Sequence, residues 1–151
     1  MSNLEQMYQQ IILDASKERY GEGLLGDANG ESFQVNPTCG DQVTMQVKVK
    51  DGKLAGLGWD GHGCSISQAS ISIMAEMVEG QELDDVDHLY ETFRHMMDSR
   101  GAELSDDDAD LLEDASAFVG VSKFPARIKC ALLGWMALRD ATEKALATKE
   151  N

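Results

Sequence analysis

Apolar residues near the start of the chain recur every three or four positions from Leu4 to Ala15. This spacing predicts an amphipathic helix, and Ser2 or Asn3 is available to cap its first turn. A cluster of glycines within residues 21–30 then predicts that the helix has ended and that a loop follows.

Alternation of apolar and polar residues at 43–50 predicts a β-strand with one buried and one solvated face. Asp51-Gly52, directly after it, has the composition of a tight hairpin turn. Two shorter strands are expected at residues 32–35 and 54–59, which makes a three-stranded antiparallel meander. The last strand is expected to place three apolar side chains on one face: Ala55, Leu57 and Trp59.

From Ser65 onward the hydrophobic period becomes helical and predicts four further helices. The first begins at Ser65, which matches a capping box together with Gln68. Acidic, amphipathic helices are expected at residues 83–97 and 105–117. A long final helix opens at Pro125, a residue type favoured at the first helical position.

These elements indicate an α+β fold in which a small three-stranded antiparallel sheet packs against helices on one side. The chain has 151 residues with no internal repeat or low-complexity tract, so it is interpreted as a single domain over residues 1–151. Apolar residues at 42% and only two prolines favour a folded globular protein over a disordered one.

The net charge of −14 is distributed unevenly along the chain. Residues 76–114 hold 15 of the 27 acidic residues but only Arg94 and Arg100 as cations, whereas the rest of the chain is close to neutral. The acidic segment is interpreted as a solvated helical surface, with steering toward a basic partner as the alternative. Nucleic-acid binding is not expected, because the sequence contains no basic patch.

No apolar stretch reaches the length of about 18 residues that a membrane span requires, and the first residues lack the pattern of a secretory signal. We therefore expect a cytoplasmic protein with no membrane association. In a reducing compartment, three cysteines are more consistent with metal ligands or reactive thiols than with disulfides.

Each cysteine lies at the end of a predicted element and not within an apolar stripe. Cys39 sits with Asp41 in the loop between the first two strands, where Gly40 permits an unusual backbone angle. Cys64 stands just before a helix, whose dipole favours a thiolate, and Cys130 lies early in the last helix beside cations that also favour a thiolate. Three thiolates and a nearby carboxylate are ligands of the kind that tetrahedral zinc takes.

These residues also have simpler interpretations. A lone cysteine is often a small buried apolar residue, and Asp41 could bond only its own turn. The gaps between the cysteines match no short zinc signature, so spacing alone is weak support. His62 could ligate a metal but is interpreted as a solvent-facing loop residue, and His88 and His95 as surface residues.

Three segments carry a recognisable pattern; they read Asn36-Pro37-x-Cys39-Gly40-Asp41, Gly61-x-Gly63-Cys64-x-Ile66-Ser67-x-Ala69-Ser70 and Phe124-Pro125-x-Arg127-x-Lys129-Cys130-Ala131. In this order they closely resemble the SufU family, the zinc-dependent sulfur-transfer branch of the IscU-like iron–sulfur cluster assembly proteins. The segment from Met7 to Asp14 is also similar to the family's opening helix, so the resemblance spans about residues 4–146.

Two details favour the SufU branch over an IscU-type scaffold. IscU-type proteins place a histidine directly before the third cysteine, where this chain has Lys129. SufU proteins also carry an extra segment before the final helix, which the acidic stretch at about residues 100–121 resembles. Residues 15–21 depart from the family's usual aromatic, basic and Asn/Pro-containing stretch, which loosens the expected contact surface near the N-terminus.

The resemblance implies an IscU/SufU-like fold and a zinc ion held by Cys39, Asp41, Cys64 and Cys130. It further implies that the protein accepts persulfide sulfur from a SufS-type, pyridoxal-phosphate-dependent cysteine desulfurase and passes it to downstream iron–sulfur assembly proteins. Cys39 is the expected acceptor, because a glycine-flanked loop can move where helix-borne cysteines cannot. Arg127 is the expected supporting group, which holds a thiolate or Asp41 in place.

Two other functions use the same four side chains. One is a non-catalytic scaffold on which a [2Fe–2S] cluster is assembled, and visible absorption after anaerobic reconstitution would favour it. The other is an interaction module with a structural zinc, in which Cys39→Ala would unfold the protein.

Overall fold

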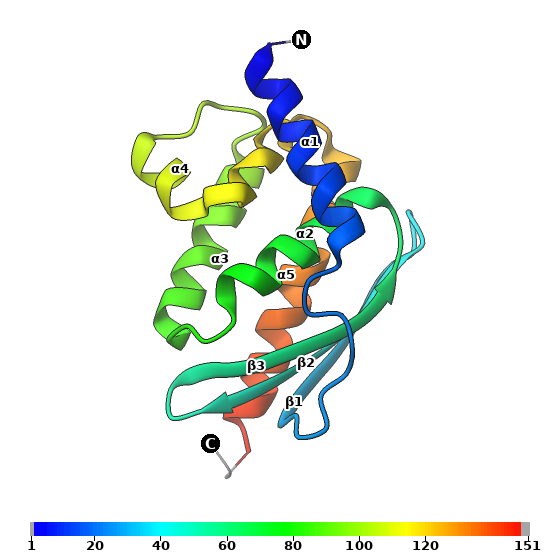
Figure 1. The fold of residues 1–151 in the computed structure, drawn as a ribbon, viewed down its shortest axis with the longest axis vertical. Helices are drawn as coiled ribbons and strands as arrows, with labels where there is room; N and C mark the ends of the chain where they lie inside the picture. The colour runs from blue at the N-terminus through cyan, green and yellow to red at the C-terminus, as the bar shows by residue number, and fades with distance from the viewer. Residues whose placement is uncertain (1, 149–151) are drawn as a thin grey trace.

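The computed structural model describes residues 2–148 and has a three-stranded antiparallel sheet with helices gathered against it (Figure 1). The strands, in the order β1-β2-β3, are β1 (Gly30–Asn36), β2 (Asp41–Lys50) and β3 (Lys53–His62). The helices are α1 (Asn3–Glu18), α2 (Ser65–Val78), α3 (Leu83–Asp98), α4 (Asp106–Leu112) and α5 (Pro125–Leu146), with 3₁₀ helices η1 (Glu113–Val119) and η2 (Val121–Lys123). The predicted α+β class and three-stranded sheet are confirmed.

The central strand, β2, carries the predicted alternation. Its odd-numbered residues from Val43 to Val49 are buried, and the residues between them are partly exposed. β3 differs from the prediction at Ala55. The register shifts after Lys48 so that the next pair joins β2 to Leu54, and Ala55 is left as the extra, exposed residue of a β-bulge. Leu54 is buried in its place.

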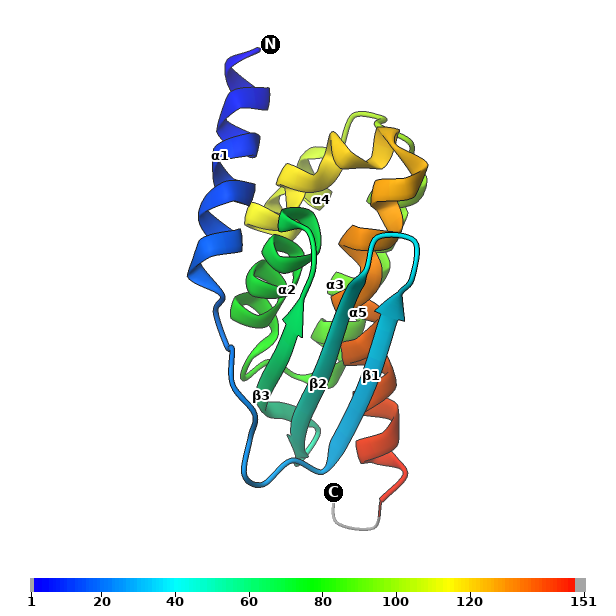
Figure 2. The ribbon, with the colours of Figure 1, turned by 90° about the vertical axis from the view of Figure 1, so that its right-hand side faces the viewer.

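α5 lies across one face of the sheet, and α2 lies beside α5 (Figure 2). Glycines permit this close packing. A Cβ at Gly134 of α5 would overlap Ile71 of α2, and a Cβ at Gly30 of β1 would overlap the backbone of Ala141. The sheet therefore rests directly on the backbone of α5, and the two helices meet at a position where only glycine fits.

α2 is buried around most of its circumference, not only along one stripe as its sequence predicts. α1 packs against it on one side and α5 on another, so even its serines are covered. The buried hydroxyl of Ser70 donates to the Ala131 carbonyl oxygen at 2.6 Å, which satisfies it inside the core. The predicted capping box is absent: Cys64 is the N-cap residue, and the Gln68 side chain bonds to Ser67 instead.

The predicted helix at residues 105–117 is two elements. α4 ends at Leu112, because Glu113 takes a left-handed backbone angle with φ 48°, and the chain continues as the 3₁₀ helix η1. Four consecutive residues of η1, from Ala115 to Phe118, are buried, which an α-helix on a surface could not achieve with a single stripe. All the acidic residues within 76–114 are exposed except Asp108, which is partly exposed, as expected for a solvated surface.

The hydrophobic core joins the inner face of the sheet to α2, α3, η1 and α5. Its largest fully buried side chains include Trp59, Phe93, Phe118 and Trp135. Within residues 2–148, no helix combines the length and the apolar character that crossing a membrane requires.

Candidate metal site

Three thiols and one carboxylate gather in one cluster. The elements that carry them meet at one end of the sheet, where β1 turns into β2 and α5 begins (Figure 2). Cys39 lies in the β1–β2 turn and Asp41 is the first residue of β2. Cys64 immediately precedes α2, and Cys130 lies in the second turn of α5. Residues up to 91 positions apart in the sequence therefore share one site.

The distances within this cluster are short. The Sγ atoms of Cys39 and Cys130 lie 3.2 Å apart. One ligand atom each from Cys39, Asp41 and Cys130 lies within 4.8 Å of the other two, which makes them a candidate metal-binding group. Cys64 lies outside this tightest group, but its Sγ is 3.7 Å from Oδ2 of Asp41. The four side chains predicted from the sequence are thus brought together, with Cys64 at the margin.

The turn that carries Cys39 is closed by the backbone carbonyl of Asn36. This oxygen accepts the N–H groups of Cys39 at 3.2 Å and of Gly40 at 2.9 Å. Gly40 has φ 73°, a left-handed angle that glycine adopts without steric cost. Cys39 is exposed, so its thiol lies at the opening of the cluster.

Asp41 holds the backbone at Cys64 through a hydrogen bond. Its side chain has 0% exposure, and its Oδ1 accepts the backbone N–H of Cys64 at 2.7 Å. A carboxylate at a helix N-terminus is stabilised by the free N–H groups there, so Asp41 supplies the cap that the sequence does not supply locally. Gly63 makes this possible, because a Cβ at that position would overlap the Asp41 carboxylate.

Cys130 is the buried member of the cluster. Its Sγ lies 3.7 Å from the Ala126 carbonyl oxygen and 3.9 Å from Nδ2 of Asn36. Burial raises the pKa of the Cys130 thiol, and hydrogen bonding with Asp41 and Cys39 raises it further. A bound cation would favour the thiolate instead of the thiol, because a cysteine that coordinates a metal releases its proton and binds as the thiolate. The donor set and its electrostatics therefore fit a divalent cation.

Arg127, the predicted supporting residue, lies on the exposed side of α5. Among the described residues, no hydrogen bond or ion pair joins its guanidinium to Asp41 or to a cysteine. Its side chain instead lines a mainly apolar groove of about 800 Å³ between α1 and the start of α5, with Ile12, Ile66 and Phe124 also on the walls.

The histidines lie outside the cluster. His62, His88 and His95 are exposed, and none of them joins a candidate metal-binding group within residues 2–148. No role was expected from the sequence for Asn36, whose side-chain amide contacts Cys130, or for Arg19, which hydrogen-bonds to Gly61 and Gln68 on either side of Cys64. Asn36 stood inside a quoted motif and could have been inferred from it, whereas Arg19 carries no local signal.

The fold and this cluster define a class of protein: a small α+β domain that gathers cysteines and an aspartate from three separate segments into one potential metal site. A family model, the NifU-like N terminal domain, matches residues 7–131. The chain belongs to this family.

Relatives support the resemblance to SufU that the motifs indicate. The chain is 40% identical to a protein of Bacillus subtilis named zinc-dependent sulfurtransferase SufU, and the match covers 99% of this chain and 95% of the relative. It is 35% identical to the iron–sulfur cluster assembly scaffold protein IscU of Thermotoga maritima, over 91% of this chain and 94% of the relative. The IscU/SufU-like fold is confirmed by a crystal structure of a candidate SUF-system scaffold protein from Fervidobacterium islandicum AW-1. That structure has a TM-score of 0.79 and 31% identity, and the match covers 90% of this chain and 96% of that chain.

Proposed function

We propose that residues 1–151 form a single cytoplasmic domain that accepts and carries persulfide sulfur for iron–sulfur cluster assembly in a zinc-dependent manner. The sulfur would come from a SufS-type cysteine desulfurase and pass to downstream assembly proteins. One observation carries the proposal: the exposed thiol of Cys39 lies 3.2 Å from the buried thiol of Cys130, beside the Asp41 carboxylate. The name of the Bacillus subtilis relative supports both the zinc and the sulfur transfer.

Cys39, Asp41, Cys64 and Cys130 would hold the zinc ion. Three sulfurs and one carboxylate oxygen are a donor set that tetrahedral zinc accepts. When bound, zinc keeps cysteine sulfurs deprotonated at neutral pH, where a free thiol is mostly protonated. The four donors come from three segments, so the site should order the end of the molecule that contains them.

Cys39 is the acceptor in this proposal because it is the exposed cysteine, whereas Cys64 is half-buried and Cys130 is buried. Its thiolate attacks the outer sulfur of the persulfide on the desulfurase cysteine. The S–S bond of that persulfide breaks, and the desulfurase cysteine leaves as a thiolate. Cys39 then carries the persulfide. The outer sulfur keeps its oxidation state, so the step needs no external oxidant or reductant.

The test combines the purified protein with a SufS-type desulfurase, pyridoxal phosphate and cysteine, and follows alanine production. The wild type should accelerate the reaction, and mass spectrometry should find one added sulfur atom on Cys39. Cys39→Ala should abolish the acceleration, whereas His62→Ala, an exposed neighbour of the site, should leave it unchanged. Acceleration that survives in Cys39→Ala would overturn the acceptor assignment.

A second function, a scaffold for [2Fe–2S] assembly, is favoured by the relatives named IscU scaffold proteins. The same four side chains would ligate the cluster. Anaerobic reconstitution with iron and sulfide separates the two functions, because a bound cluster absorbs visible light and a zinc protein is colourless. A stable coloured product that displaces zinc would favour the scaffold.

Arg127 remains a proposed positioning residue. It lies three positions before Cys130 on α5, and residues three apart on a helix are neighbours on its surface. Its guanidinium could therefore hold a thiolate or Asp41 once the site is loaded. Arg127→Ala should keep its zinc content but slow sulfur transfer, and Arg127→Lys should restore the rate in part. Equal rates in all three proteins would remove Arg127 from the proposal.

A further inference from the structure

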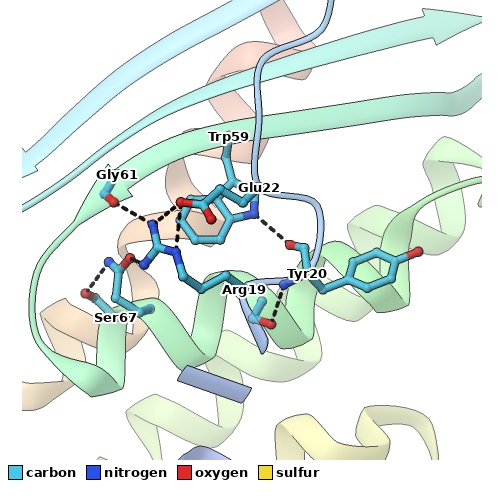
Figure 3. Close-up of polar contacts among 8 residues, drawn as sticks. Arg19, Tyr20, Glu22, Trp59, Gly61 and Ser67 are labelled. Atoms are coloured by element: carbon cyan, nitrogen blue, oxygen red, sulfur yellow. Dashed lines mark hydrogen bonds and ion pairs between the residues drawn. The ribbon is translucent and has the colours of Figure 1, made fainter. Parts of the chain in front are cut away.

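Arg19 forms an extensive set of contacts just after the end of α1 (Figure 3). Its Nη1 donates to Oε1 of Gln68 at 2.6 Å, and its Nη2 donates to the carbonyl oxygen of Gly61 at 2.8 Å. Its Nε donates to Oε2 of Glu22 at 2.8 Å. The guanidinium also stacks over the Trp59 ring, 4.7 Å from the ring centroid. One side chain thus links α1, β3 and α2.

These contacts lie on both sides of Cys64 in the sequence. Gly61 comes three residues before it and Gln68 four residues after it. From Gln68 the hydrogen bonds continue, because its Nε2 donates to the Ser67 hydroxyl at 3.2 Å and that hydroxyl donates to the Cys64 carbonyl oxygen at 3.0 Å. Arg19 therefore reaches the backbone of the turn before Cys64 directly and the backbone of Cys64 itself through two side chains.

Arg19 is itself held in place. Its backbone is left-handed, with φ 49° and ψ 50°, and its N–H bonds to the Ala15 carbonyl oxygen to close α1. The next residue is tied down twice: the Tyr20 N–H donates to Oγ of Ser72 at 2.9 Å, and the Tyr20 carbonyl oxygen accepts Nε1 of Trp59 at 2.7 Å. Because its backbone is held in this way, the Arg19 guanidinium can keep the Gly61 carbonyl and the Gln68 side chain, which it contacts, in place.

Residues 61–64 lead from β3 to α2, and Gly61 and His62 are still paired with β2 at the end of β3. Gly63, which follows them, has φ 153° and the wide conformational freedom of glycine. Asp41 holds one end of the turn through the Cys64 N–H, and Arg19 holds the other end through the Gly61 carbonyl oxygen. Cys64 is also the cysteine that lies outside the tightest ligand group, so its position depends most on this turn.

We propose that Arg19 is a positioning residue for Cys64: by fixing the β3–α2 turn it keeps the Cys64 thiol within reach of the metal site. This inference rests on the proposed function, because it takes Cys64 to be a zinc ligand. Among the described residues, no hydrogen bond or ion pair joins the Arg19 side chain to a candidate ligand side chain, so its proposed effect is on the geometry of the site and not on the transfer step.

The test compares Arg19→Met with a matched control, Arg139→Met. The Arg139 guanidinium stacks over the Tyr90 ring at 4.9 Å and pairs with Glu91 at 3.2 Å, so it loses contacts of the same kinds at a place remote from the cysteines. Zinc affinity is measured by competition with a chromophoric chelator. Cobalt substitution then reports the number of thiolates through the intensity of the sulfur-to-cobalt absorption, with Cys64→Ser as the reference for a lost Cys64 ligand.

Arg19→Met should weaken zinc binding by about 10- to 100-fold, the range for groups that orient metal ligands, and its cobalt spectrum should move toward that of Cys64→Ser. Arg139→Met should have the zinc affinity and the cobalt spectrum of the wild type. Arg19→Lys keeps the charge but not the fork that contacts Gly61 and Gln68 together, so its affinity should be intermediate. If Arg19→Met does not fold, Arg19→Lys takes its place in the comparison.

Zinc affinity of Arg19→Met and Arg19→Lys within twofold of Arg139→Met, or a cobalt spectrum with full thiolate intensity, would overturn the inference. Failure of the wild type to bind zinc would overturn the proposed function instead, and the wild-type arm of the same titration reports it directly. The two failures are therefore distinguishable.

Discussion

The first two turns of α5 and the part of the helix around Trp135 belong to two regions that bury different kinds of side chain. We call the first the cysteine end: the turns at 36–41 and 61–64 and the first two turns of α5. We call the second the aromatic core, in which Trp135 stacks on Phe93 with centroids 4.7 Å apart and Phe118 meets Phe93 edge-on at 5.9 Å. Trp135 follows Cys130 by five positions on the same helix.

The difference lies in what is buried. The aromatic core buries mainly apolar surface, and the Trp135 indole N–H donates to Oγ of Ser70 at 3.2 Å. The cysteine end buries Asp41 and Asn36, polar groups that contribute little by hydrophobic burial, beside the thiol of Cys130. The core should therefore hold the fold by itself, whereas the cysteine end should gain its order from a bound cation. Three predictions test this contrast, and a fourth concerns a partly exposed carboxyl outside both regions.

The largest effect is expected from Trp135→Ala. Truncating a fully buried aromatic side chain should lower the free energy of unfolding by about 3–5 kcal/mol. Urea unfolding followed by circular dichroism measures it, with the exposed neighbour Met136→Ala as the control. The loss should be the same with and without zinc. A loss that vanishes in the zinc-loaded protein would show that the two regions are not independent.

The second prediction concerns metal removal. Zinc at a thousandfold excess over its dissociation constant should raise the free energy of unfolding by about 4 kcal/mol, and a chelator should remove this increment. Cys39→Ala should lose most of the increment but change the zinc-free stability by no more than about 0.5 kcal/mol, since Cys39 is exposed. Unfolding of zinc-free Cys39→Ala would contradict this and favour a structural role for the thiol.

The third prediction compares two glycines of the cysteine end. Gly63→Ala would press a Cβ against the Asp41 carboxylate, so it should cost about 1–3 kcal/mol and weaken zinc binding sharply. Gly40→Ala has open space around its Cβ and should cost only about 1 kcal/mol, from its φ of 73°. Unfolding measurements and chelator competition on both variants check this order. Equal zinc affinities of the two variants would show that zinc binding does not depend on the close contact between Asp41 and residue 63.

The smallest effect is expected at Asp140, on the side of α5 that faces β1. The Ser32 hydroxyl, which donates to its Oδ2 at 2.6 Å, and then the Lys144 ammonium lower the pKa of Asp140 below its ordinary 3.8. A carboxyl with a lowered folded-state pKa stabilises the fold above pH 3.8, and this stabilisation is lost as the pH falls through the lowered pKa. The effect should stay well under about 1 kcal/mol, because the side chain is partly exposed.

Urea unfolding of Asp140→Asn against the wild type, from neutral to strongly acidic pH, measures this contribution. The difference should be constant near neutrality and disappear in acid. A difference that grows on acidification would have the wrong sign and would contradict the assignment.

Much of the fold follows from local patterns, and the exceptions have definite causes. The alternation in β2 and the start of α5 at Pro125 are confirmed, because periodicity and capping act between near neighbours. Ala55 was placed on the wrong face, since a β-bulge is created by pairing between two strands. The prediction of one helix at 105–117 was wrong, because its second half is the 3₁₀ helix η1, in which four consecutive side chains are buried against the rest of the fold.

The candidate site shows the same division. Cys39 and Asp41 were predicted together because they are two residues apart in one turn. Cys64 and Cys130 were joined to them by ligand chemistry and then by the resemblance to a family, since no local pattern measures distance between segments far apart in the sequence. The contacts of Arg19 with Gln68 of α2 and Gly61 of β3 could not be predicted, because both partners lie far from it in the sequence.

The sequence by itself determined which stretches become helices and strands, where the thiols stand relative to their ends, and which surface carries the negative charge. These properties depend on spacing, turn chemistry and composition, which act locally along the chain. Only the tertiary structure decided that a buried carboxylate caps the helix after Cys64, that Cys39 is exposed while Cys130 is buried, and that Arg19 contacts residues on both sides of Cys64. Those outcomes depend on close packing between segments that the chain brings together only when it folds.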